Sequence, residues 1–581
     1  MSEPLHTRWG RSLDREHPLP EYPRPQFRRD SYVNLNGLWD YAFTASESQP
    51  GVWEGKIVVP FSPESALSGV GRAIQSGEVL HYRRFFTLPG DFHRGRVLLH
   101  FGAVDQEAAV FLNGAELGRH AGGYTAFSFD ITDALRPGGN ELHVAVRDDA
   151  EDARFGRGKQ SKKPGGIWYT AQSGIWQTVW MESVPELYIR SLRLTPCYDE
   201  ERLELEIRLS HEAAIVTADV YDQGEFVAGS YFKGGRCVIP LPRFRPWSPE
   251  DPHLYQLRLR AGEDQVESYF AMRKFSYTDY HGRKVFALNN RPYFHNGLLD
   301  QGYWPDGLLT PPSDEAMVFD IATARALGYN TLRKHIKIEP MRWYYHCDRL
   351  GMLVWQDMVN GGGTQDTILT SVAPLMGLVR HSDSDYALFR RDAPASRSQY
   401  LSELGETMAQ LRNCPCIALW TPFNEGWGQF DAVRIAAAMA ESDSTRYVDH
   451  ASGWHDQGWG SITSRHVYFR PVRLKNDGRA LCLSEYGGYS LSVPGHCWGR
   501  KVFGYKLFRS AAGLLSAYDR LIRRQIAPLI AAEGLTAAIY TQLTDVESEC
   551  NGLITYDREM VKLPERELRE INELLRFEGQ E

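Results

Sequence analysis

The chain has 581 residues, 43% of them hydrophobic and 24% charged, and its formal net charge is −8. This mixture is typical of a folded globular protein that is long enough to form several cores. The mild acidity without a basic stripe argues against nucleic acid as a partner, and the lack of any run of about 18 apolar residues argues against a membrane span.

The cysteines and the N-terminal residues indicate a compartment. The eight cysteines are scattered, only Cys414 and Cys416 lie close together, and no second pair completes a zinc site. Sparse cysteines of this kind are typical of a reducing environment. The first residues contain no apolar segment of the kind found in signal peptides. We therefore expect a cytoplasmic protein.

Short β-rich segments broken by Gly, Pro and Asn dominate the first third of the chain. They are His81–Pro89, Gly95–Val104, Glu107–Gly118 and Asn140–Asp149. Asn113 and Gly114 lie between two apolar runs and are a strong signal for a two-residue hairpin. Short strands at regular spacing predict a jelly-roll sandwich over residues 1–185.

A second β region follows, in which apolar and polar residues alternate. The alternation is clear in Leu187–Pro196, Arg202–His211, Ala213–Asp222 and His253–Gly262. A period of two is typical of strands with one buried face. This pattern predicts an immunoglobulin-like β-sandwich over residues 186–280.

From about residue 281 strands alternate with helices. The eight strand candidates are Tyr293–Leu298, Asn330–His335, Met352–Met358, Cys416–Trp420, Arg446–His450, His466–Phe469, Leu481–Gly488 and Ala537–Leu543. Eight such repeats predict a (β/α)8 TIM barrel over residues 281–581, so the expected fold class is multidomain β plus α/β. Residues 364–397 lack periodicity, and a loop of that length is usually a site wall, a lid or disordered.

In a barrel of this kind, reactive side chains lie at the C-terminal ends of the strands. Strands four and seven lie across the mouth from each other, so Glu425 and Glu485 are predicted to converge. The residues found at the strand ends are Arg333 and His335 after the second strand, Asp357 after the third, Asn424 and Glu425 after the fourth, Tyr468 at the sixth, Glu485 at the seventh, and Gln542 and Asp545 at the eighth.

Two convergent carboxyl groups are what glycoside hydrolysis requires. One must be protonated to give a proton to the leaving oxygen, and the other must be ionised to attack or to activate water. Arg333 would hold one carboxylate ionised by direct attraction, and Tyr468 would donate a hydrogen bond to the same group. Desolvation near Trp420 and Trp427 would raise the pKa of the other. Taken alone, Glu425 could instead cap a helix or form a salt bridge.

Further motifs extend along nearly the whole chain. They are "LNGLWDYAF" (Leu35–Phe43), "HYRRFFTLP" (His81–Pro89), "VFLNGAELGRHAGGYTAFSFDIT" (Val110–Thr132), "TAQSGIWQTVWME" (Thr170–Glu182), "RPYFHNGLLDQGYWPDG" (Arg291–Gly307), "TPFNEGWGQF" (Thr421–Phe430), "LSEYGGY" (Leu483–Tyr489) and "YTQLTDVESECNGLITYDR" (Tyr540–Arg558). Together they resemble a short, three-domain branch of glycoside hydrolase family 2, which contains β-galactosidases and β-glucuronidases. The most specific matches are the Asn-Glu pair that ends the fourth strand and the Glu that ends the seventh.

The resemblance implies roles for five of these residues. Glu425 would be the general acid/base and Glu485 the nucleophile of a double displacement. Asn424 would hydrogen-bond the 2-hydroxyl of the sugar. Arg333 and Tyr468 would set the charge and geometry of Glu485.

The chain also departs from better-known members of that family. Where many carry a Ser-His-Tyr-Pro run, this sequence has "RKHIKIEP" (Arg333–Pro340). The family's glucuronidases use an Asn-x-Lys element to bind the substrate carboxylate, and none is found between Thr541 and Lys562. The resemblance therefore favours a neutral sugar over a uronic acid.

Other side chains are assigned by position or type. Trp427 would offer an apolar face to a sugar ring. His450 and His466 are expected to be structural, no His/Asp/Glu spacing requires a metal, and no cofactor is expected. Further candidates for substrate contacts, with core packing or rim ion pairs as the alternatives, are Asp357, Gln542, Asp545, Trp304 and His335.

The sequence thus predicts a retaining, exo-acting β-glycosidase that hydrolyses terminal neutral sugars and is β-galactosidase-like. One alternative is the same mechanism on another glycon: a mannoside, arabinoside, galactofuranoside or glucuronide. A second alternative is a carbohydrate-binding protein without turnover. The expected partner is an oligosaccharide or glycoside, and both a monomer and a homo-oligomer stay open.

Overall fold

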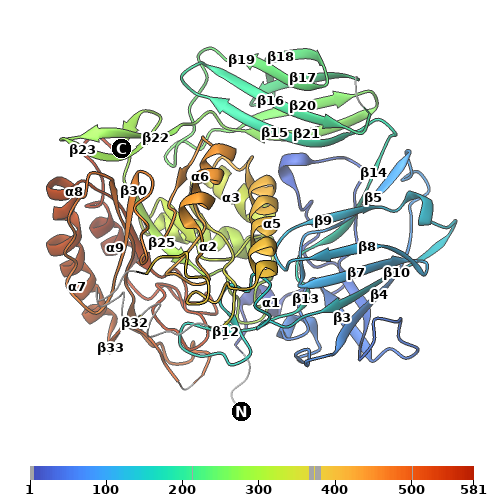
Figure 1. Ribbon diagram of the computed structural model, residues 1–581, viewed down its shortest axis with the longest axis horizontal. Helices are drawn as coiled ribbons and strands as arrows, with labels where there is room; N and C mark the ends of the chain where they lie inside the picture. Colours follow the sequence, from blue (N-terminus) through green and yellow to red (C-terminus); the bar gives the residue numbers. More distant parts are fainter. Residues whose placement is uncertain (1–4, 212–213, 365–371, 373–380, 500, 581) are drawn as a thin grey trace.

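The computed structural model describes residues 5–211, 214–364, 372, 381–499 and 501–580. Figure 1 shows three parts: a sandwich of N-terminal residues on the right, a second sandwich on top, and a barrel with its helices on the left. The chain passes through the parts in this order. The predicted fold class, two β domains followed by a TIM barrel, is therefore confirmed.

Two antiparallel sheets form most of the first part. Their strand orders are β3-β2-β4-β10-β7-β8 and β1-β14-β5-β9, and their inner faces share a core that includes Trp39, Tyr82 and Phe101. Asn113 and Gly114 have φ values of 54° and 85° and connect β7 to β8, so the predicted hairpin is confirmed. The strands are β1 (Val33–Asn34), β2 (Gly37–Thr44), β3 (Gly55–Val59), β4 (Val79–Thr87), β5 (Arg96–Phe101), β6 (Val104–Asp105), β7 (Glu107–Leu112), β8 (Ala115–Ala121), β9 (Phe127–Asp130), β10 (Gly139–Arg147), β11 (Gln160–Ser161), β12 (Tyr169–Thr170), β13 (Gly174–Ile175) and β14 (Val179–Val184).

The second part is a smaller sandwich. A three-stranded sheet, β15-β16-β19, packs against a four-stranded sheet, β18-β17-β20-β21. Buried and exposed residues alternate along all of β20, as the period-two pattern predicted. The strands are β15 (Ile189–Cys197), β16 (Arg202–Leu209), β17 (Ile215–Asp222), β18 (Glu225–Lys233), β19 (Gly235–Pro240), β20 (Tyr255–Ala261) and β21 (Asp264–Phe270).

The third part is a parallel barrel of eight strands. Their order is β29-β28-β27-β26-β25-β34-β31-β30, which follows the chain around the ring. The two ends of this order, β29 and β30, form a seam where the Ser452 and Ser464 hydroxyls lie 3.3 Å apart. The barrel is therefore nearly closed. Its strands are β25 (His295–Asp300), β26 (Thr331–Lys334), β27 (Leu353–Asp357), β28 (Ile417–Thr421), β29 (Tyr447–Val448), β30 (Ile462–Val467), β31 (Ala480–Gly487) and β34 (Leu535–Thr541).

Helices and two small sheets complete the molecule. Figure 1 shows the helices around the outside of the barrel. Serines cap the N-termini of two of them. The Ser313 hydroxyl accepts from the Ala316 N–H in α2, and the Ser510 hydroxyl accepts from the Gly513 N–H in α7. The helices are α1 (Arg8–Arg11), α2 (Asp314–Ala326), α3 (Met341–Leu350), α5 (Pro394–Leu411), α6 (Ala432–Ser442), α7 (Ala511–Leu521), α8 (Ala527–Glu533) and α9 (Glu565–Asn572). The small sheets contain β22 (Phe275–Tyr280), β23 (Arg283–Leu288) and β24 (Arg291–Pro292), and β32 (Tyr489–Leu491) and β33 (Lys506–Phe508).

The aperiodic segment 364–397 is described only in part. Residues 365–371 and 373–380 lie outside the described residues. The end of the segment is helical, because α5 begins at Pro394. The role of this segment as a wall or lid of a site stays a prediction.

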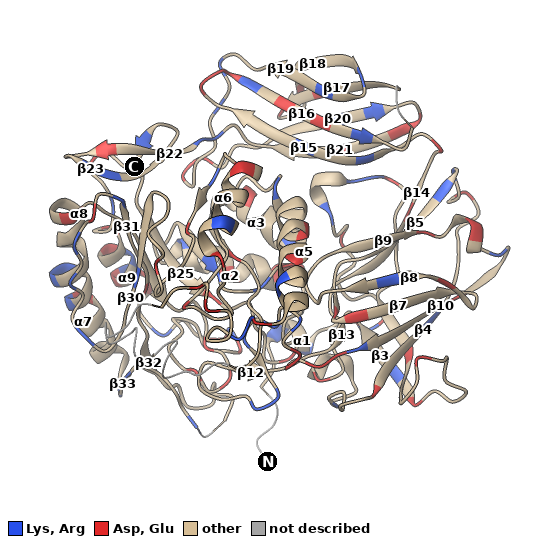
Figure 2. Cartoon of the chain, viewed as in Figure 1, with Lys and Arg blue, Asp and Glu red and all other residues tan. Residues whose placement is uncertain are grey.

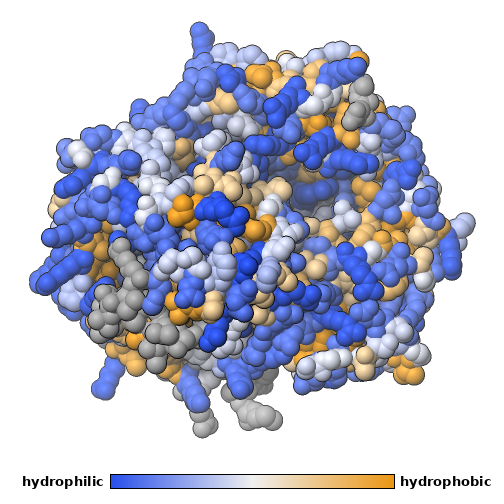
Figure 3. Space-filling model, in the orientation of Figure 1, coloured by the Kyte–Doolittle hydropathy of each residue, from blue (hydrophilic) through white to orange (hydrophobic). Residues whose placement is uncertain are grey.

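The surface carries both charge signs. Figure 2 shows acidic and basic residues interspersed over all three parts, and Figure 3 shows a largely hydrophilic face that is hollowed beneath the second sandwich. A cavity of about 410 Å³ lies where the three parts meet, lined by Phe127, Leu192 and Gln410 among others. Within the described ranges, no helix is long and apolar enough to cross a membrane.

Candidate active site

The strand β28 leads to the first candidate carboxyl group. All its residues are buried, and beyond it the Glu425 N–H donates to the Ser452 carbonyl oxygen at 2.9 Å. Glu425 has a φ of 52°, in the left-handed region that costs a non-glycine residue roughly 1–3 kcal/mol. Such strain persists only where the surroundings fix the backbone. The turn therefore holds the Glu425 carboxyl group at the mouth of the barrel.

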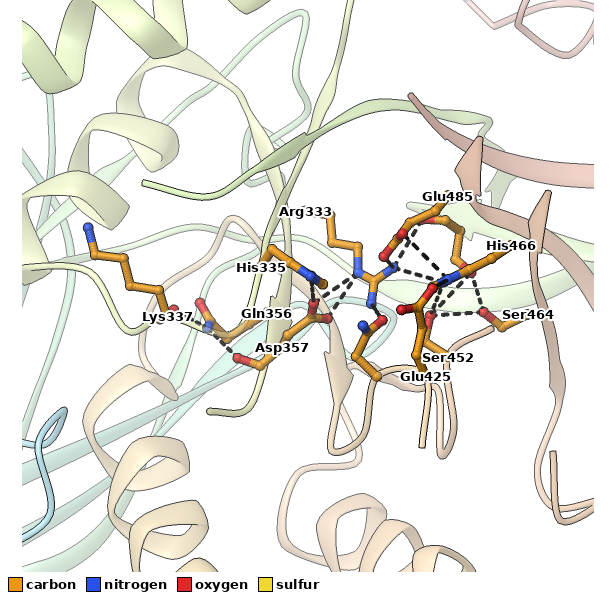
Figure 4. A network of polar contacts seen from close by, with 12 residues as sticks. Arg333, His335, Lys337, Gln356, Asp357, Glu425, Ser452, Ser464, His466 and Glu485 are labelled. Carbon is orange, nitrogen blue, oxygen red and sulfur yellow. Dashed lines mark hydrogen bonds and ion pairs between the residues drawn. The ribbon is translucent and has the colours of Figure 1, made fainter. Parts of the chain in front are cut away.

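Arg333, in β26, is the centre of the polar network in Figure 4. Its buried guanidinium donates to Asp357 at 3.0 Å, to Asn424 Oδ1 at 2.8 Å and to Glu485 Oε1 at 3.1 Å. Burial lowers the pKa of Arg333, but the carboxylates of Asp357 and Glu485 outweigh burial and raise it above its ordinary value. A fixed cation therefore lies beside Glu485.

Glu485, in β31, has further partners that stabilise its ionised form. The Tyr468 hydroxyl donates to Oε2 at 2.7 Å, and His466 Nδ1 lies 3.4 Å from the same oxygen. Burial and the neighbouring Glu425 raise the pKa of Glu485 above its ordinary value, while His466, Arg333 and Tyr468 oppose that rise. This is the environment expected of a nucleophile that must stay ionised.

Glu425 lies in a different environment. Burial raises the pKa of Glu425 to about 7, against the opposing charges of Lys159 and Arg333. At neutral pH a substantial fraction of this group is therefore protonated. Oxygens of Glu425 and Glu485 lie within 4.8 Å of each other. Two neighbouring carboxyl groups with unequal environments can divide the roles of acid and nucleophile.

His466 lies between the two carboxyl groups, although the sequence analysis expected a structural histidine. Its Nδ1 is 2.8 Å from Glu425 Oε1, and its Nε2 is 3.1 Å from Ser452 Oγ and 3.4 Å from Arg333 Nη1. A guanidinium only donates, so we assign Nε2 as the acceptor and Nδ1 as the protonated nitrogen. Burial lowers the pKa of His466 to about 4, so the ring is neutral at pH 7.

Asn424 and Trp427 flank Glu425 in the sequence and lie at the same site. Asn424 accepts from Arg333, while its buried Nδ2 has no hydrogen-bond partner in the part of the chain that the structure describes. An unpartnered buried donor costs on the order of 1–3 kcal/mol unless a ligand satisfies it. Trp427 packs against Trp168, with 5.2 Å between ring centroids. Asn424 therefore has the free donor that a sugar-binding amide needs.

Asp357 and His335 lie behind Arg333. Asp357 accepts from Arg333 and lies 2.8 Å from His335 Nδ1. Burial raises the pKa of Asp357, but Arg333 and His335 outweigh it and hold that pKa below its ordinary value. These two residues therefore position the guanidinium rather than contact the carboxyl pair directly.

Asp545 and Trp304 have structural partners elsewhere. Asp545 forms a buried ion pair with Lys562 at 2.6 Å. The ring of Trp304 lies under the Arg558 guanidinium, 4.0 Å from the ring centroid. These contacts favour the rim ion pair and the core packing that the sequence analysis held as alternatives to a substrate contact.

Gln542 leads to a third carboxylate. It is fully buried and donates to Asn551 Oδ1 at 2.8 Å, and Asn551 Nδ2 donates to Glu549 Oε1 at 2.9 Å. Glu549 was not singled out from the sequence. Gln542 is therefore linked through Asn551 to the Glu549 carboxylate.

Lys159 was also missed. It belongs to the first part of the chain, yet its ammonium lies 4.7 Å from the centroid of the Trp427 ring and interacts electrostatically with Glu425 and Glu485. The sequence carried one weak signal, a lysine in a glycine-containing loop. Which loops contact the barrel depends on tertiary packing, so the sequence could not predict that Lys159 lies near the carboxyl groups.

The two carboxyl groups and His466 also meet the spacing of a metal site. Among the described residues, one group of three potential metal ligands has its ligand atoms within 4.8 Å of one another: Glu425, His466 and Glu485. A metal ligand must offer a lone pair, whereas our tautomer assignment places the proton on the nitrogen that faces both carboxyl groups. The arrangement therefore fits proton transfer better than metal binding.

Paired carboxyl groups thus lie at the mouth of a TIM barrel that follows two β-sandwiches. Residues 72–181 match the model "Glycosyl hydrolase 2 galactose-binding domain-like", and residues 284–474 match the model "Glycosyl hydrolases family 2, TIM barrel domain". The chain belongs to glycoside hydrolase family 2, which confirms the resemblance found in the sequence.

Curated relatives are longer than this chain. A β-galactosidase of Aeromonas hydrophila is 26% identical over 464 residues, which cover 72% of this chain and 42% of the relative. A putative β-glucuronidase of Formosa agariphila is 28% identical over 506 residues, which cover 81% of this chain and 58% of the relative. The chain thus spans about half the length of the curated relatives it matches.

Solved structures show the same fold over almost the entire chain. A β-glucuronidase from an uncultured Clostridium has a TM-score of 0.74 at 16% identity, covering 94% of this chain and 99% of that one. A family 2 β-galacturonidase from Eisenbergiella tayi has a TM-score of 0.71 at 18% identity, covering 96% and 100%. At such identities the likeness establishes the fold alone.

Proposed function

We propose that the protein is a retaining, exo-acting β-glycosidase that acts on a terminal neutral sugar. The observation that carries this proposal is the pair of Glu425 and Glu485, whose oxygens lie within 4.8 Å of each other. Oxygens this close support the short spacing of double displacement, roughly 5–5.5 Å between carboxyl groups, over the roughly 6.5–9.5 Å that leaves room for a water. The unequal environments of the two groups supply one acid and one nucleophile.

The reaction then has two balanced steps. Protonated Glu425 gives its proton to the glycosidic oxygen while Glu485 attacks the anomeric carbon, so the bond to the aglycon breaks and an ester to Glu485 forms. Ester formation removes the charge of Glu485, and the pKa of Glu425 falls. Ionised Glu425 then takes a proton from water as the water attacks the anomeric carbon and releases Glu485. Two inversions retain the configuration.

Neighbouring groups have separate roles in this proposal. Arg333 and Tyr468 keep Glu485 ionised and aimed, as their hydrogen bonds to its two oxygens support. The free amide donor of Asn424 would bind the 2-hydroxyl of the sugar. The His466 N–H would stabilise Glu425 when it is ionised as the base of the second step.

For the glycon we propose a neutral hexose, as in a β-galactosidase. The relative from Aeromonas is named a β-galactosidase, and residues 541–562 contain no Asn-x-Lys element. A glucuronide is the second candidate, because another relative is named a putative β-glucuronidase. Turnover of a mannoside, arabinoside or galactofuranoside would keep the same mechanism.

The division of the chain near residues 185 and 280 is part of the proposal. It is supported by the end of β14 at Val184 and by the span from β15 to β21. Seven strands in a three-plus-four arrangement support an immunoglobulin-like second domain. All eight cysteines are free, which supports a reducing, cytoplasmic location. Sedimentation velocity would measure whether the chain forms a homo-oligomer.

A panel of 4-nitrophenyl β-glycosides tests the activity. We expect turnover of at least one neutral β-glycoside, and proton NMR should find the β-anomer as the first product. A first-formed α-anomer would move the protein to the inverting class. No turnover of any member by the folded wild type would instead favour a carbohydrate-binding protein.

A further inference from the structure

Lys159 is a buried cation without an ion pair. It directly precedes β11 and is 6% exposed, yet no carboxylate in the described ranges forms an ion pair with its ammonium. Its contacts are the faces of Trp427 and Trp168, whose ring centroids lie 4.7 Å and 5.8 Å from Nζ. Buried ammonium groups are almost always paired. Lys159 therefore has donor capacity that these contacts do not use.

Backbone contacts to the barrel hold Lys159 in this position. The N–H groups of Arg157 and Gly158 donate to the Asn360 carbonyl oxygen at 2.8 Å and 2.9 Å, and Gly156 pairs with Gly361. A Cβ at Gly361 would lie 2.1 Å from the Phe155 carbonyl oxygen, so this approach requires glycine. A loop of the first part is thus fixed to the segment that follows β27.

Glu549, which follows β34, is the charged group that most affects Lys159. Tyr169 connects the two residues, because its N–H donates to the Lys159 carbonyl oxygen at 3.0 Å and its hydroxyl donates to Glu549. Burial lowers the pKa of Lys159 and raises that of Glu549, and each charge opposes the shift of the other. The structure shows no ion pair between them, and Glu549 accepts from the Tyr169 hydroxyl at 2.5 Å and from Asn551 Nδ2 at 2.9 Å. Each carboxylate oxygen can accept a second hydrogen bond. Lys159 can therefore still donate a hydrogen bond to a ligand, and Glu549 can still accept one.

We propose that Lys159 and Glu549 bind one hydroxyl group of the sugar between them, so that the first part of the chain completes the glycon-binding site. This inference rests on the proposed glycosidase function. A hydroxyl can accept from the Lys159 ammonium and donate to Glu549 at once, which a carboxylate cannot do. The faces of Trp427 and Trp168 beside the ammonium offer apolar surface to the C–H groups of the ring.

The charges around Lys159 favour a neutral sugar. Glu549, Glu425 and Glu485 all act on its ammonium, while Arg333 is already bound to Asp357 and Glu485. A sugar carboxylate at this place would be attracted by one ammonium and repelled by Glu549 and the ionised Glu485, whereas protonated Glu425 adds no repulsion. Glu549 beside Lys159 therefore favours a hydroxyl over a carboxylate.

The test uses full-length Lys159→Gln and Glu549→Gln. Lys162→Gln is the matched control, because Lys162 lies close to Lys159 in the sequence and forms a surface ion pair with Asp149. The substrates are 4-nitrophenyl β-D-galactopyranoside, its 3-, 4- and 6-deoxy analogues, and the β-D-galacturonide. We expect each of the two site variants to lower kcat/KM on the parent about 10–100-fold, and the control to leave it within about twofold.

The deoxy analogues separate binding from a structural role. If Lys159 binds one hydroxyl, its substitution has little further effect on the analogue that lacks this hydroxyl, so the two losses are not additive. Additive losses on every analogue would overturn the proposal. Faster turnover of the galacturonide than of the galactoside by the wild type would also overturn it.

A binding measurement keeps this inference distinct from the proposed function. If the wild type hydrolyses no glycoside, the proposed function fails, and titrations with D-galactose and D-galacturonate are followed by tryptophan fluorescence. We expect tighter binding of galactose and a loss of about tenfold or more in Lys159→Gln. Equal binding by wild type and variant overturns the inference.

Discussion

Glu425 combines a left-handed backbone, burial and a raised pKa in one residue. Its φ is 52° and its pKa is about 7. Each feature costs free energy in the folded state, and such costs are concentrated at functional sites. Substitutions at Glu425 should therefore separate activity from stability.

The first prediction concerns the pH dependence of activity. The acid form of Glu425 is lost as pH rises through its pKa of about 7, so kcat/KM should fall about tenfold per pH unit above that value. Glu425→Gln should lose about 10²–10⁴-fold in kcat on substrates with poor leaving groups and should lack this alkaline limb. Persistence of the same limb in the variant would assign it to another group.

The second prediction concerns stability. Because the folded pKa of Glu425 is raised from 4.5 to about 7, its contribution is fully present below pH 4.5 and is lost as pH rises to about 7. Glu425→Gln cannot ionise and avoids this loss, which is about 3 kcal/mol. Thermal unfolding should therefore show the variant gaining stability relative to wild type between pH 4.5 and 8. A constant difference across this range would contradict the raised pKa.

The third prediction distinguishes the two carboxyl groups chemically. Glu485→Ala should abolish turnover, and azide should restore it by attacking the anomeric carbon once, giving a glycosyl azide of inverted configuration. Glu425→Ala should keep activity on substrates with good leaving groups, which need no acid. NMR of the azide product makes the assignment. An inverted azide from Glu425→Ala alone would reverse the two roles.

At the residue scale, the predicted strand ends identified candidate site residues, but the sequence did not give the exact first and last residue of each strand. Glu425 and Glu485 could be placed because each follows an apolar run, and Arg333 because it lies at the end of a predicted barrel strand. His466 was expected to be structural, as most histidines are, and its strand was predicted to run from His466 to Phe469. The observed β30, Ile462–Val467, puts it near the mouth. A shift of a few residues thus moves a side chain from one end of the barrel to the other.

At the element scale, a loop of the first part is joined to a loop of the barrel through closely packed glycines. This gives a fourth prediction: Gly361→Ala should displace the loop that carries Lys159 and lower kcat/KM about tenfold or more, because small misplacements in a site are costly. Gly363→Ala is the control, since its Cβ would meet nothing closer than 3.4 Å. Equal kinetics for the two variants would show that the loop contact does not position the site.

The existence of most barrel strands could be predicted from the sequence. The seam between β29 and β30 could not. Arg446–His450 was predicted as a strand of ordinary length, whereas β29 contains only Tyr447–Val448. It lies at one end of the sheet order, where it pairs with β28 alone. How many residues of a strand join the sheet depends on its neighbours, which its own sequence does not report.

At the scale of the whole molecule, Arg29 links the two sandwiches. Its buried guanidinium donates to Glu182 at 3.1 Å in the first and to Asp264 at 2.8 Å in the second. The fifth prediction is that Arg29→Ala lowers the free energy of unfolding by about 3–5 kcal/mol, because buried Asp264 loses its cation and Glu182 keeps only Arg24. Arg28→Ala should change it by less than about 1 kcal/mol, since Arg28 forms an exposed ion pair with Glu267.

Urea titrations followed by circular dichroism would compare these neighbouring variants. Equal stabilities of Arg29→Ala and Arg28→Ala would show that the buried contact does not couple the sandwiches. The three-part plan itself could be predicted, because alternation and βα repeats are local patterns. The contacts between parts could not, since a sequence pattern does not report which surfaces meet.

The site joins parts of the chain that are made at different times. Tyr169 and Glu549, which share a hydrogen bond, are 380 residues apart. At a synthesis rate of roughly 5–20 residues per second, the first part waits roughly 20–80 s on the ribosome before its partner carboxylate emerges. A nascent chain therefore contains the whole first part before it contains the complete proposed sugar site. Synthesis order alone delays the onset of activity until the polypeptide is almost finished.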